Sequence, residues 1–375
     1  MIKYLGSKRR LLDLLLAIVG RVIEAEPGHG GPRGRTVLDL FSGTSRVGHA
    51  LKRAGYRVVA NDHNAYAHTL ATCYVEADAE SIEGDARRLI AELQALPGAP
   101  GYFTSTFCER ARYIQPRNGA KIDAIREAIA DKSLPPELEA VLLVSLMEAA
   151  DRVDSTTGLQ MAYLKSWSAR SYQPLELRMP AILPRAAAGK GEAHRLDAAV
   201  AAGRFPVDVA YLDPPYNQHS YLGNYHVWES LCRWDKPEVY GRACKRVDCR
   251  ERQSPFNSRR RCREALAEVL ARVEAATVIV SFSNEGFLTR DDLTGMLARW
   301  GPSAVVEVDY RRYIGAQIGI YNPKGERVGE VSHVRNKELI FVAGAGAATI
   351  DELGERGESG GIGEGERSSS AEAQG

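Results

Sequence analysis

Short apolar runs alternate with amphipathic segments in the first and last parts of the chain. The apolar runs have the length and composition of buried strands, and the segments after them carry apolar residues at helical spacing. The expected strands cover residues 36–41, 55–62, 192–197, 207–212 and 277–284. Two of the expected helices end near residues 20 and 53. Three more cover residues 198–202, 264–273 and 291–300. Strands that alternate with helices predict an α/β fold with a largely parallel, doubly wound sheet.

The alternation changes in two places. Two apolar runs, residues 304–310 and 337–342, flank a long basic loop and predict a terminal antiparallel hairpin. Between residues 65 and 190 only helical periodicity remains, broken by prolines, over residues 64–96, 117–131 and 136–152. We therefore expect a discontinuous α/β domain, formed by residues 1–64 and 191–342, with a helical insertion at residues 65–190. The Gly-, Glu- and Ser-rich residues 343–375 are expected to be a disordered acidic tail.

A tight turn of small residues follows the first expected strand. Ser42 and Gly43 lie in this turn, directly after Phe41, and a helix follows it. The second strand ends on Asp62, 19 residues beyond Gly43, where nucleotide-binding folds place a carboxylate that binds the ribose hydroxyls. A coincidental glycine turn is the alternative. The turn and the spaced acid together favour a nucleotide-like cofactor.

The sequence Asp213-Pro214-Pro215-Tyr216 follows the expected strand at residues 207–212. An acid, two prolines and an aromatic residue form a rigid corner suited to a planar amine, because the Asp213 carboxylate and the Pro214 carbonyl can both accept its hydrogens. Tyr216 would stack on the ring that carries the amine. An ordinary strand-ending turn is the alternative for this tetrapeptide taken alone.

Charge is distributed unevenly along the chain. The total is +1, but residues 343–375 carry seven acids and two arginines, so the first 342 residues carry a net charge of +6. Residues 242–263 hold nine Lys or Arg against two acids, including Arg259, Arg260 and Arg261. The expected helical insertion interleaves basic and aromatic residues, among them Arg112, Lys121 and Lys165. Both segments suit a phosphate backbone, and the alternative is a solvated, charged surface.

The remaining composition excludes several classes of protein. No apolar run approaches the roughly 20 residues of a membrane span, and the N-terminal residues do not resemble a signal peptide. The six cysteines are scattered and include no C-x-x-C pair, so we expect reduced thiols in a prokaryotic cytosol and no metal site. His226, in an aromatic segment, is expected to be a core or pocket-wall residue.

The ordered motifs resemble those of the Dam-like, alpha-group DNA adenine-N6 methyltransferases. The resemblance rests on Lys3 to Lys8, Asp39 to Thr44, Asn61-Asp62, Leu196-Asp197 and the corner Asp213 to Tyr216. It spans most of residues 1–342. It implies a Rossmann-like methyltransferase sheet with an inserted helical target-recognition domain, and S-adenosylmethionine as cofactor without a metal.

The resemblance also implies roles for individual residues. Tyr4 and Lys8 would hold the methionine end of the cofactor, and residues 41–45 would wrap it. Asp62 would bind the ribose and Asp197 the adenine amino group. Two positions depart from the family pattern: Ser45 replaces the second glycine of Phe-x-Gly-x-Gly, and Ala198 replaces a larger apolar residue. Serine is tolerated at such a position when its φ is negative.

The resulting hypothesis is site-specific methylation of adenine N6 in duplex DNA after base flipping. The expected partners are double-stranded DNA and a cognate restriction endonuclease, and the expected state is a monomer. Three alternatives remain open: methylation of cytosine N4, methylation of adenine in RNA, and an inactive nucleic-acid-binding protein. A glutamine methyltransferase is disfavoured because that group has Asn where this chain has Asp213.

Overall fold

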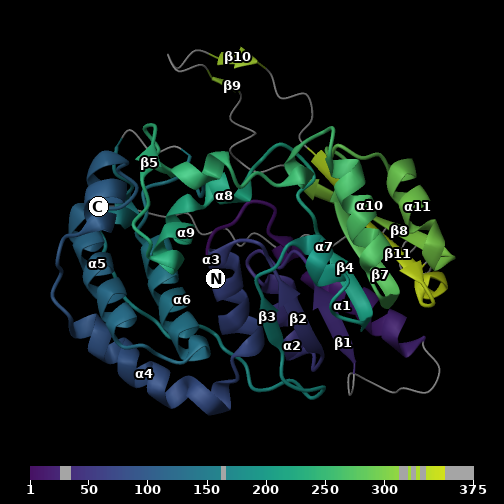
Figure 1. The fold of residues 1–375 in the computed structure, drawn as a ribbon, viewed down its shortest axis with the longest axis horizontal. Helices are drawn as coiled ribbons and strands as arrows, with labels where there is room; N and C mark the ends of the chain where they lie inside the picture. The colour runs from purple at the N-terminus through teal and green to yellow at the C-terminus, as the bar shows by residue number, and fades with distance from the viewer. Residues whose placement is uncertain (26–34, 162–165, 312–319, 322–326, 330–334, 351–375) are drawn as a thin grey trace, which may run out of the picture.

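The computed structural model describes residues 1–25, 35–161, 166–311, 320–321, 327–329 and 335–350. Its centre is a seven-stranded sheet with the strand order β3-β2-β1-β4-β7-β11-β8 (Figure 1). The first five strands in this order are parallel, and β11 runs antiparallel to both of its neighbours. The strands are β1 (Thr36–Asp39), β2 (Arg57–Asn61), β3 (Glu192–His194), β4 (Val207–Leu212), β7 (Ala275–Ser283), β8 (Ser303–Arg311) and β11 (Arg335–Gly344). The predicted α/β sheet and its terminal antiparallel hairpin are confirmed.

Helices cover both faces of the sheet because its strands are apolar on both sides. In β1, Val37 faces one core with Leu15 and Leu51, whereas the next residue, Leu38, faces another core with Leu266 and Leu293. The first core includes α1 (Leu12–Glu24) and α2 (Arg46–Arg53). The second includes α7 (Ala198–Ala202), α10 (Cys262–Arg272) and α11 (Arg290–Leu297). The two helical layers hold the strand ends in fixed positions.

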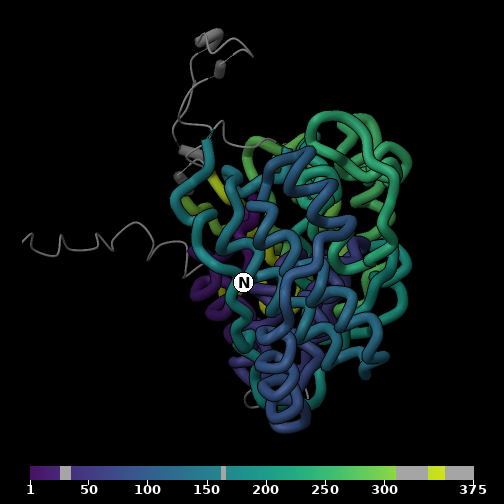
Figure 2. The backbone as a smooth tube through the Cα atoms, turned by 90° about the vertical axis from the view of Figure 1, so that its left-hand side faces the viewer, coloured from purple at the N-terminus to yellow at the C-terminus, as the bar shows by residue number. Residues whose placement is uncertain are grey.

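A third core lies beside the sheet and is mainly helical. Its helices form the layer on the left of Figure 1, which faces the viewer in Figure 2. They are α3 (Ala65–Ala71), α4 (Ala79–Ala95), α5 (Pro116–Asp131), α6 (Pro136–Arg152) and α9 (His226–Arg233). Arg126 of α5 donates hydrogen bonds to the carbonyls of Leu231 (2.8 Å) and Cys232 (3.1 Å) at the end of α9. The helical layer is thereby joined to the segment that follows the Asp213 corner.

Short elements complete the chain. They are η1 (Lys8–Arg10), the π-helical η2 (Thr72–Glu76) and η3 (Thr104–Arg110), η4 (Ala169–Tyr172), α8 (Tyr221–Asn224), β5 (Val239–Tyr240), β6 (Lys245–Arg246), η5 (Val247–Arg250), η6 (Pro255–Asn257), η7 (Ala298–Trp300), β9 (Ile320–Tyr321), β10 (Arg327–Gly329) and η8 (Ala347–Thr349). The tail predicted from residue 343 begins too early, because β11 extends to Gly344 and Ile350 is fully buried against the α1 side of the sheet. Residues 351–375 lie outside the described residues.

The strand order reverses direction between β1 and β4. From β1 the chain adds β2 and β3 on one side, and from β4 it adds β7 on the other. Ligands of open α/β sheets bind beyond the carboxyl ends of the strands at such a switch point. Asp39 ends β1 and is paired with Tyr211 of β4, so the acids Asp39 and Asp213 emerge at this point from adjacent strands.

Candidate active site

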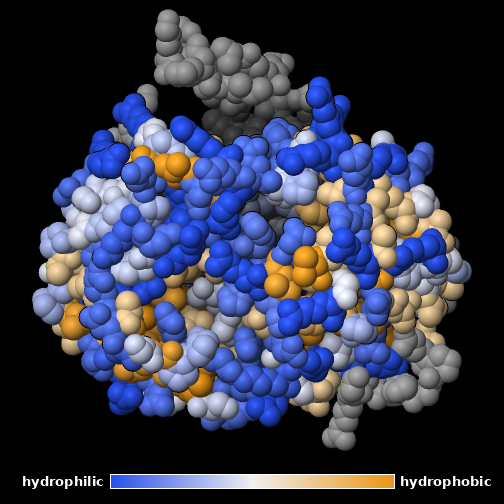
Figure 3. All heavy atoms as spheres, viewed as in Figure 1, coloured by the Kyte–Doolittle hydropathy of each residue, from blue (hydrophilic) through white to orange (hydrophobic). Residues whose placement is uncertain are grey.

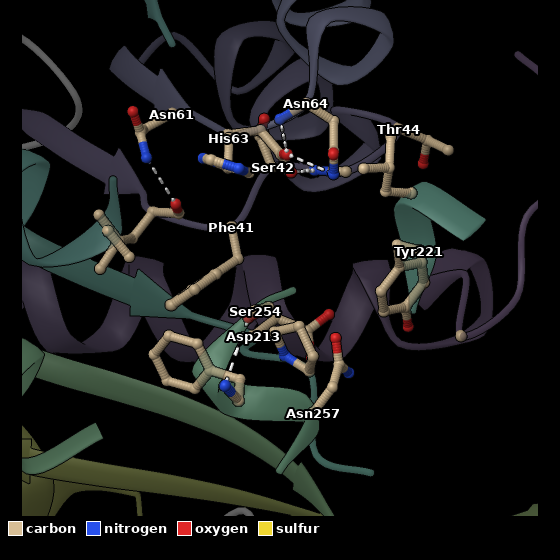
Figure 4. Close-up of a pocket in the computed structure, with 18 of the residues that line it drawn as sticks. Phe41, Ser42, Thr44, Asn61, His63, Asn64, Asp213, Tyr221, Ser254 and Asn257 are labelled. Carbon is tan, nitrogen blue, oxygen red and sulfur yellow. Dashed lines mark hydrogen bonds between the residues drawn. The ribbon is translucent and has the colours of Figure 1, made fainter. Parts of the chain in front are cut away.

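A cavity of about 300 Å³ lies at this switch point. Five groups of residues form its walls: the N-terminal residues Tyr4 and Gly6 to Lys8, the turn after β1 with residues 61–64, residues 196–198, the residues around Asp213 and α8, and the segment Glu251–Asn257. In Figure 4, Ser42 and Asn64 lie across the cavity from Asp213, with Tyr221 at one side. The turn, Asp62 and the Asp213 corner, which are far apart in the sequence, therefore share one cavity.

Gly43 is required by the geometry of the turn. Its φ is +50°, and a Cβ atom added to it would lie 3.3 Å from the ring of Tyr4. Its amide donates a hydrogen bond to Asp62 Oδ2 at 3.0 Å, and the neighbouring Ser42 amide donates to the carbonyl of Asn61 at 2.9 Å. Glycine alone combines this backbone conformation with so close an approach. The turn is thus fastened to the end of β2.

Ser45 does not meet the condition under which a serine is tolerated in the turn. Its φ is +57° and its ψ is 24°, in the left-handed region, where a side chain costs about 1–2 kcal/mol. Its side chain is fully buried, and its Oγ has no hydrogen-bond partner among the described residues. Ser45 therefore falls outside the case in which serine is tolerated, and the departure from the Phe-x-Gly-x-Gly pattern strains the turn.

Asp62 and Asp197 both line the cavity, at the ends of β2 and just beyond β3. Asp62 accepts hydrogen bonds from the amides of Gly43 and Asn64, which orient its carboxylate. Burial raises the pKa of Asp62, and these two hydrogen bonds oppose that rise. Asp197 accepts from the amide of Ala199 at 2.9 Å and caps α7. Its role toward an adenine amino group stays a prediction.

Asp39 is a buried acid of the cavity wall, for which the motif Asp39 to Thr44 predicted no separate role. Its Oδ2 accepts a hydrogen bond from the amide of Gly48 at 3.1 Å, and its Oδ1 has no partner among the described residues. Burial, reinforced by the charge of Asp213, raises the pKa of the Asp39 carboxyl to about 7. A cation in the cavity would satisfy this oxygen. Asp39 is thus a candidate ligand for the ammonium group of an amino acid.

Tyr4 lies in a cluster of tyrosines beside the turn. Its ring stacks with those of Tyr221 and Tyr225, with centroid distances of 5.2 and 4.6 Å, and these two rings are themselves 6.5 Å apart. Its hydroxyl lies 3.1 Å from that of Tyr66. The stack packs the N-terminal segment against α8 and α9, and Tyr4 presents an edge to Gly43. Tyr4 lines the cavity, and its contact with the methionine end of the cofactor stays a prediction.

Asp213 lies at the carboxyl end of β4, with its side chain 20% exposed. Its Oδ1 is 2.9 Å from the ammonium of Lys8, which is also 2.7 Å from Oε1 of Glu338. Burial raises the pKa of Asp213, with the charge of Lys8 opposing it and that of Glu338 adding to it. Lys8, predicted to hold the methionine end of the cofactor, therefore already has two anionic partners.

The rest of the corner is oriented by packing. Pro214 is buried, and Pro215 contributes to the cavity wall. The Tyr216 ring packs against Phe282, with centroids 5.8 Å apart, and its carbonyl accepts a hydrogen bond from the amide of Phe287 at 2.9 Å. These contacts join the corner to β7 and the residues after it. Stacking of Tyr216 on a base stays a prediction.

The segment Glu251–Asn257 is the part of the site that sequence reasoning missed. Phe256 places its ring edge-on to Phe41, with centroids 5.2 Å apart, and both line the cavity. Arg252 pairs with the fully buried Glu229 at 2.9 Å. Arg246, also within the predicted basic loop, is buried between Asp235 and Asp248. Much of this basic run therefore folds over the cavity and packs against α9. Phe256, an aromatic residue within the basic run, was the signal in the sequence that part of this run is buried.

The predicted DNA-binding residues fall into three groups. Arg259, Arg260 and Arg261 are exposed immediately before α10. Arg112 is exposed, with its guanidinium 5.3 Å from the ring centre of Trp167. Lys121 instead donates to the carbonyls of Gln94 and Leu96 at the end of α4, a structural role that weighs against phosphate binding. Lys165 lies outside the described residues.

Other expectations concern features away from the cavity. His226 is fully buried, shares a hydrogen bond of 2.9 Å with the carbonyl of Gln160, and has its pKa lowered to about 3 by burial, so it belongs to the core as predicted. In the described ranges, His, Cys, Asp and Glu side chains form no group of three or more able to hold a metal ion. No helix in the described part of the chain is long and apolar enough to cross a membrane.

In this sheet β11 runs antiparallel to its neighbours, and an acid-lined cavity lies at the switch point. With the family match below, these features define the protein as a methyltransferase of the S-adenosylmethionine-dependent, Rossmann-like class. The family model for D12 class N6 adenine-specific DNA methyltransferases matches residues 4–275. The chain belongs to this family of enzymes, and the predicted class of enzyme is confirmed.

Several curated proteins are similar to the chain. Type II methyltransferase M.NlaIII of Neisseria lactamica is 28% identical over 342 residues, which cover 89% of this chain and 99% of that protein. Modification methylase StsI of Streptococcus sanguinis and type II methyltransferase M.FokI of Planomicrobium okeanokoites are each 28% identical over 83% of this chain. The chain spans only 48% and 49% of their lengths, respectively. No solved structure matches the chain.

Proposed function

We propose that this chain transfers a methyl group from S-adenosylmethionine to the N6 amino group of adenine in duplex DNA. The observation that carries the proposal is the position of Asp213 in the cavity wall. Its Oδ1 is held by Lys8 at 2.9 Å, and no described residue is bonded to its Oδ2. One carboxylate oxygen is thereby fixed, and the other can accept a hydrogen bond from a substrate amine.

The adenine amino nitrogen needs help to act as a nucleophile, because its lone pair is delocalised into the ring. If Asp213 Oδ2 and the Pro214 carbonyl each accept one of its hydrogens, the nitrogen is drawn toward tetrahedral geometry. Tyr216 would stack on the flipped base, a contact worth about 1–3 kcal/mol. When bound, the cofactor supplies an electrophilic methyl group, whose bond to sulfur breaks as the new N–C bond forms. The surplus proton then leaves nitrogen for Asp213 or water.

The cavity residues fit the parts of S-adenosylmethionine. The Oδ1 of Asp39, which has no partner in the described part of the chain, suits the ammonium of the methionine end, and the oriented carboxylate of Asp62 suits the ribose hydroxyls. Arg46 lines the same cavity, donates to the carbonyl of Ile2 and has a buried Nε without a partner among the described residues. Since Lys8 is held by two acids, Arg46 is the better candidate for the methionine carboxylate. Tyr4 and Ser42 would complete this end.

The ring of the cofactor would lie at the other end of the cavity. Phe41 and Phe256 meet edge to face there, and Leu196, Asp197 and Ala198 line the adjoining wall. Asp197 has a second carboxylate oxygen beyond the one that caps α7, and this oxygen could accept from the adenine amino group. Phe256 would supply the apolar surface that the small side chain of Ala198 does not.

DNA is proposed to cover the hydrophilic face that Figure 3 shows over α8 and the start of α10. Arg259, Arg260 and Arg261 would contact phosphates there, and the stacked Arg112 would do so from the helical layer. Residues 65–190 would form most of the target-recognition part, with α9 packed on the same core. Base flipping would then bring adenine to Asp213 at a cost of a few kcal/mol.

The biological setting forms part of the same proposal. M.NlaIII and M.FokI are named type II methyltransferases, and StsI is named a modification methylase. We propose a corresponding restriction-modification role with a cognate endonuclease, for a monomer acting in the prokaryotic cytosol.

A transfer assay tests the function directly. Duplex DNA from a host without adenine methylation is incubated with the protein and S-adenosylmethionine, digested to nucleosides and analysed by mass spectrometry. N6-methyl-2′-deoxyadenosine is expected with the wild type, and none with Asp213→Asn at equal cofactor binding. N4-methylcytosine would change the assigned target. No modified base on DNA or RNA, despite cofactor binding, would reject the assigned activity.

A further inference from the structure

Glu338 is a buried acid behind the Asp213 corner that no sequence motif marked. Its Oε1 is 2.7 Å from the ammonium of Lys8 and accepts a hydrogen bond of 2.7 Å from the hydroxyl of Ser281. The side chains of Lys8 and Glu338 are only 8% and 9% exposed. The same ammonium is 2.9 Å from Asp213 Oδ1, so one cation is shared by two acids at the edge of the cavity.

The three residues come from elements that the sheet fixes relative to one another. Lys8 begins η1, Asp213 follows β4, and Glu338 lies on β11. In β11, Glu338 is paired with Ser283 of β7 and with Val308 of β8, so a strand on each side holds its backbone. Glu338 is therefore not free to follow Lys8. It determines where the ammonium lies.

Sharing one ammonium between two carboxylates leaves this cluster with an excess of negative charge. Although burial lowers it, the charges of Asp213 and Glu338 raise the pKa of Lys8 well above its usual value, so Lys8 stays protonated. An amine that attacks a methyl group gains positive charge as the N–C bond forms. A buried, preorganised negative potential stabilises such charge more strongly than water does.

We propose that Glu338 is a positioning residue for methyl transfer. It anchors Lys8 on Oδ1 of Asp213 so that Oδ2 accepts the target amino group, and its charge adds to the negative potential that the attacking nitrogen meets. This inference rests on the proposed function. The pairing of Glu338 with Lys8 extends the site to β11, beyond the residues that the family motifs contain.

A neighbouring acid provides a matched control. Glu307 of β8 lies beside β11 and pairs with Lys337 at 2.8 Å and Arg290 at 2.7 Å, but its side chain is 36% exposed and does not line the cavity. Replacing either glutamate by glutamine removes one carboxylate from a Lys-containing ion pair at the same end of the sheet. A difference between the two variants therefore reports on the position of Glu338.

The first measurement is the single-turnover rate of methyl transfer to unmethylated duplex DNA. Glu338→Gln is expected to lower it about ten- to hundredfold, less than the 10²–10³ lost with a directly contacting group. Glu307→Gln is expected to stay within about twofold. Glu338→Asp, which keeps the charge, should restore part of the rate. The dissociation constant of S-adenosylhomocysteine, measured by calorimetry, should change less than about twofold because its sulfur is uncharged.

A double-mutant cycle separates positioning from a general effect on folding. If Glu338 acts largely through Lys8, Glu338→Gln causes a clearly smaller loss in a Lys8→Gln background than in the wild type, because only the contribution of its own charge remains, whereas independent effects add. Cofactor binding by both variants shows that they are folded. Fully additive losses, or a Glu338→Gln rate equal to that of Glu307→Gln, overturn the inference.

The pH profile adds a readout that a purely structural role would not move. The negative charge of Glu338 contributes to raising the pKa of Asp213. Replacing Glu338 by glutamine therefore lowers that pKa, and the acid limb of the pH–rate profile moves to lower pH. The other groups that face Asp213 are Lys8 of η1, Asp39 of β1, Tyr211 of β4 and Tyr221 of α8. An unmoved limb contradicts the inference. A wild type that methylates no nucleic acid rejects the proposed function instead, so the two failures are distinguishable.

Discussion

Replacement of Ser45 by glycine should stabilise the protein. Ser45 occupies the left-handed region at φ +57°, which costs a side chain about 1–2 kcal/mol. Its buried hydroxyl has no hydrogen-bond partner among the described residues, and such a group costs about 1–3 kcal/mol. Glycine removes both costs but adds about 0.5–1 kcal/mol of chain entropy to the unfolded state. A net gain of about 1–4 kcal/mol in the free energy of unfolding follows from these terms.

Urea denaturation with Ser45→Ala as the matched control separates the two contributions. Alanine removes the hydroxyl but keeps a Cβ atom at positive φ, so it should recover only the hydroxyl contribution. Glycine should then exceed alanine by about 0.5–1 kcal/mol, the strain less the entropy. Ser42→Gly gives a second comparison, since Ser42 is a buried serine of the same turn that is not at positive φ. If Ser45→Gly is no more stable than Ser45→Ala, the strain argument is refuted.

Two further predictions concern the cavity walls. The pKa of Asp39 is raised from 3.8 to about 7, and burial of its carboxyl group is the largest cause. The folded state thus holds this proton more tightly than the unfolded state, and the contribution of Asp39 to stability falls as pH rises from about 4 to 7. The Asp39→Asn variant should not show that fall, so its urea midpoint should exceed the wild-type midpoint by more at pH 8 than at pH 5. Its affinity for the cofactor should also weaken. An equal difference between the two midpoints at both pH values would contradict the assignment. Phe256→Ala should raise the dissociation constant of the cofactor about tenfold, because stacking on an aromatic ring contributes about 1–3 kcal/mol to binding. An unchanged dissociation constant in calorimetry would show that the Phe256 ring does not contact the cofactor.

The sheet was predictable because its signals are local. Apolar runs bounded by turns locate the strands, and parallel strands end at one edge of a sheet, so acids at strand ends meet there. The positions of Asp62 and Asp213 in one cavity follow from this rule. The β8–β11 hairpin was predictable for the same reason, as two apolar runs separated by a loop.

The missed features depend on contacts between distant segments. Glu338 lies 330 residues from Lys8, in a strand whose pattern shows only that it is a strand. Phe256 was obscured by the basic residues around it, several of which pair with acids that no local pattern connects to them. The sign of φ at Ser45 is set by the turn that the chain must close, and residue type alone did not reveal it. Lys121 contacts helix carbonyls because α4 happens to end beside it.

The pairing of Lys8 with Glu338 also constrains when the enzyme becomes competent during synthesis. Lys8 is translated 330 residues before its partner. Since β11 lies between β7 and β8, the sheet stays open until that strand has left the ribosome. A nascent chain therefore holds its turn, corner and cofactor walls before it holds the acid that places Lys8. Methylation activity should thus begin only after β11 emerges, so a chain interrupted before that strand would not modify DNA.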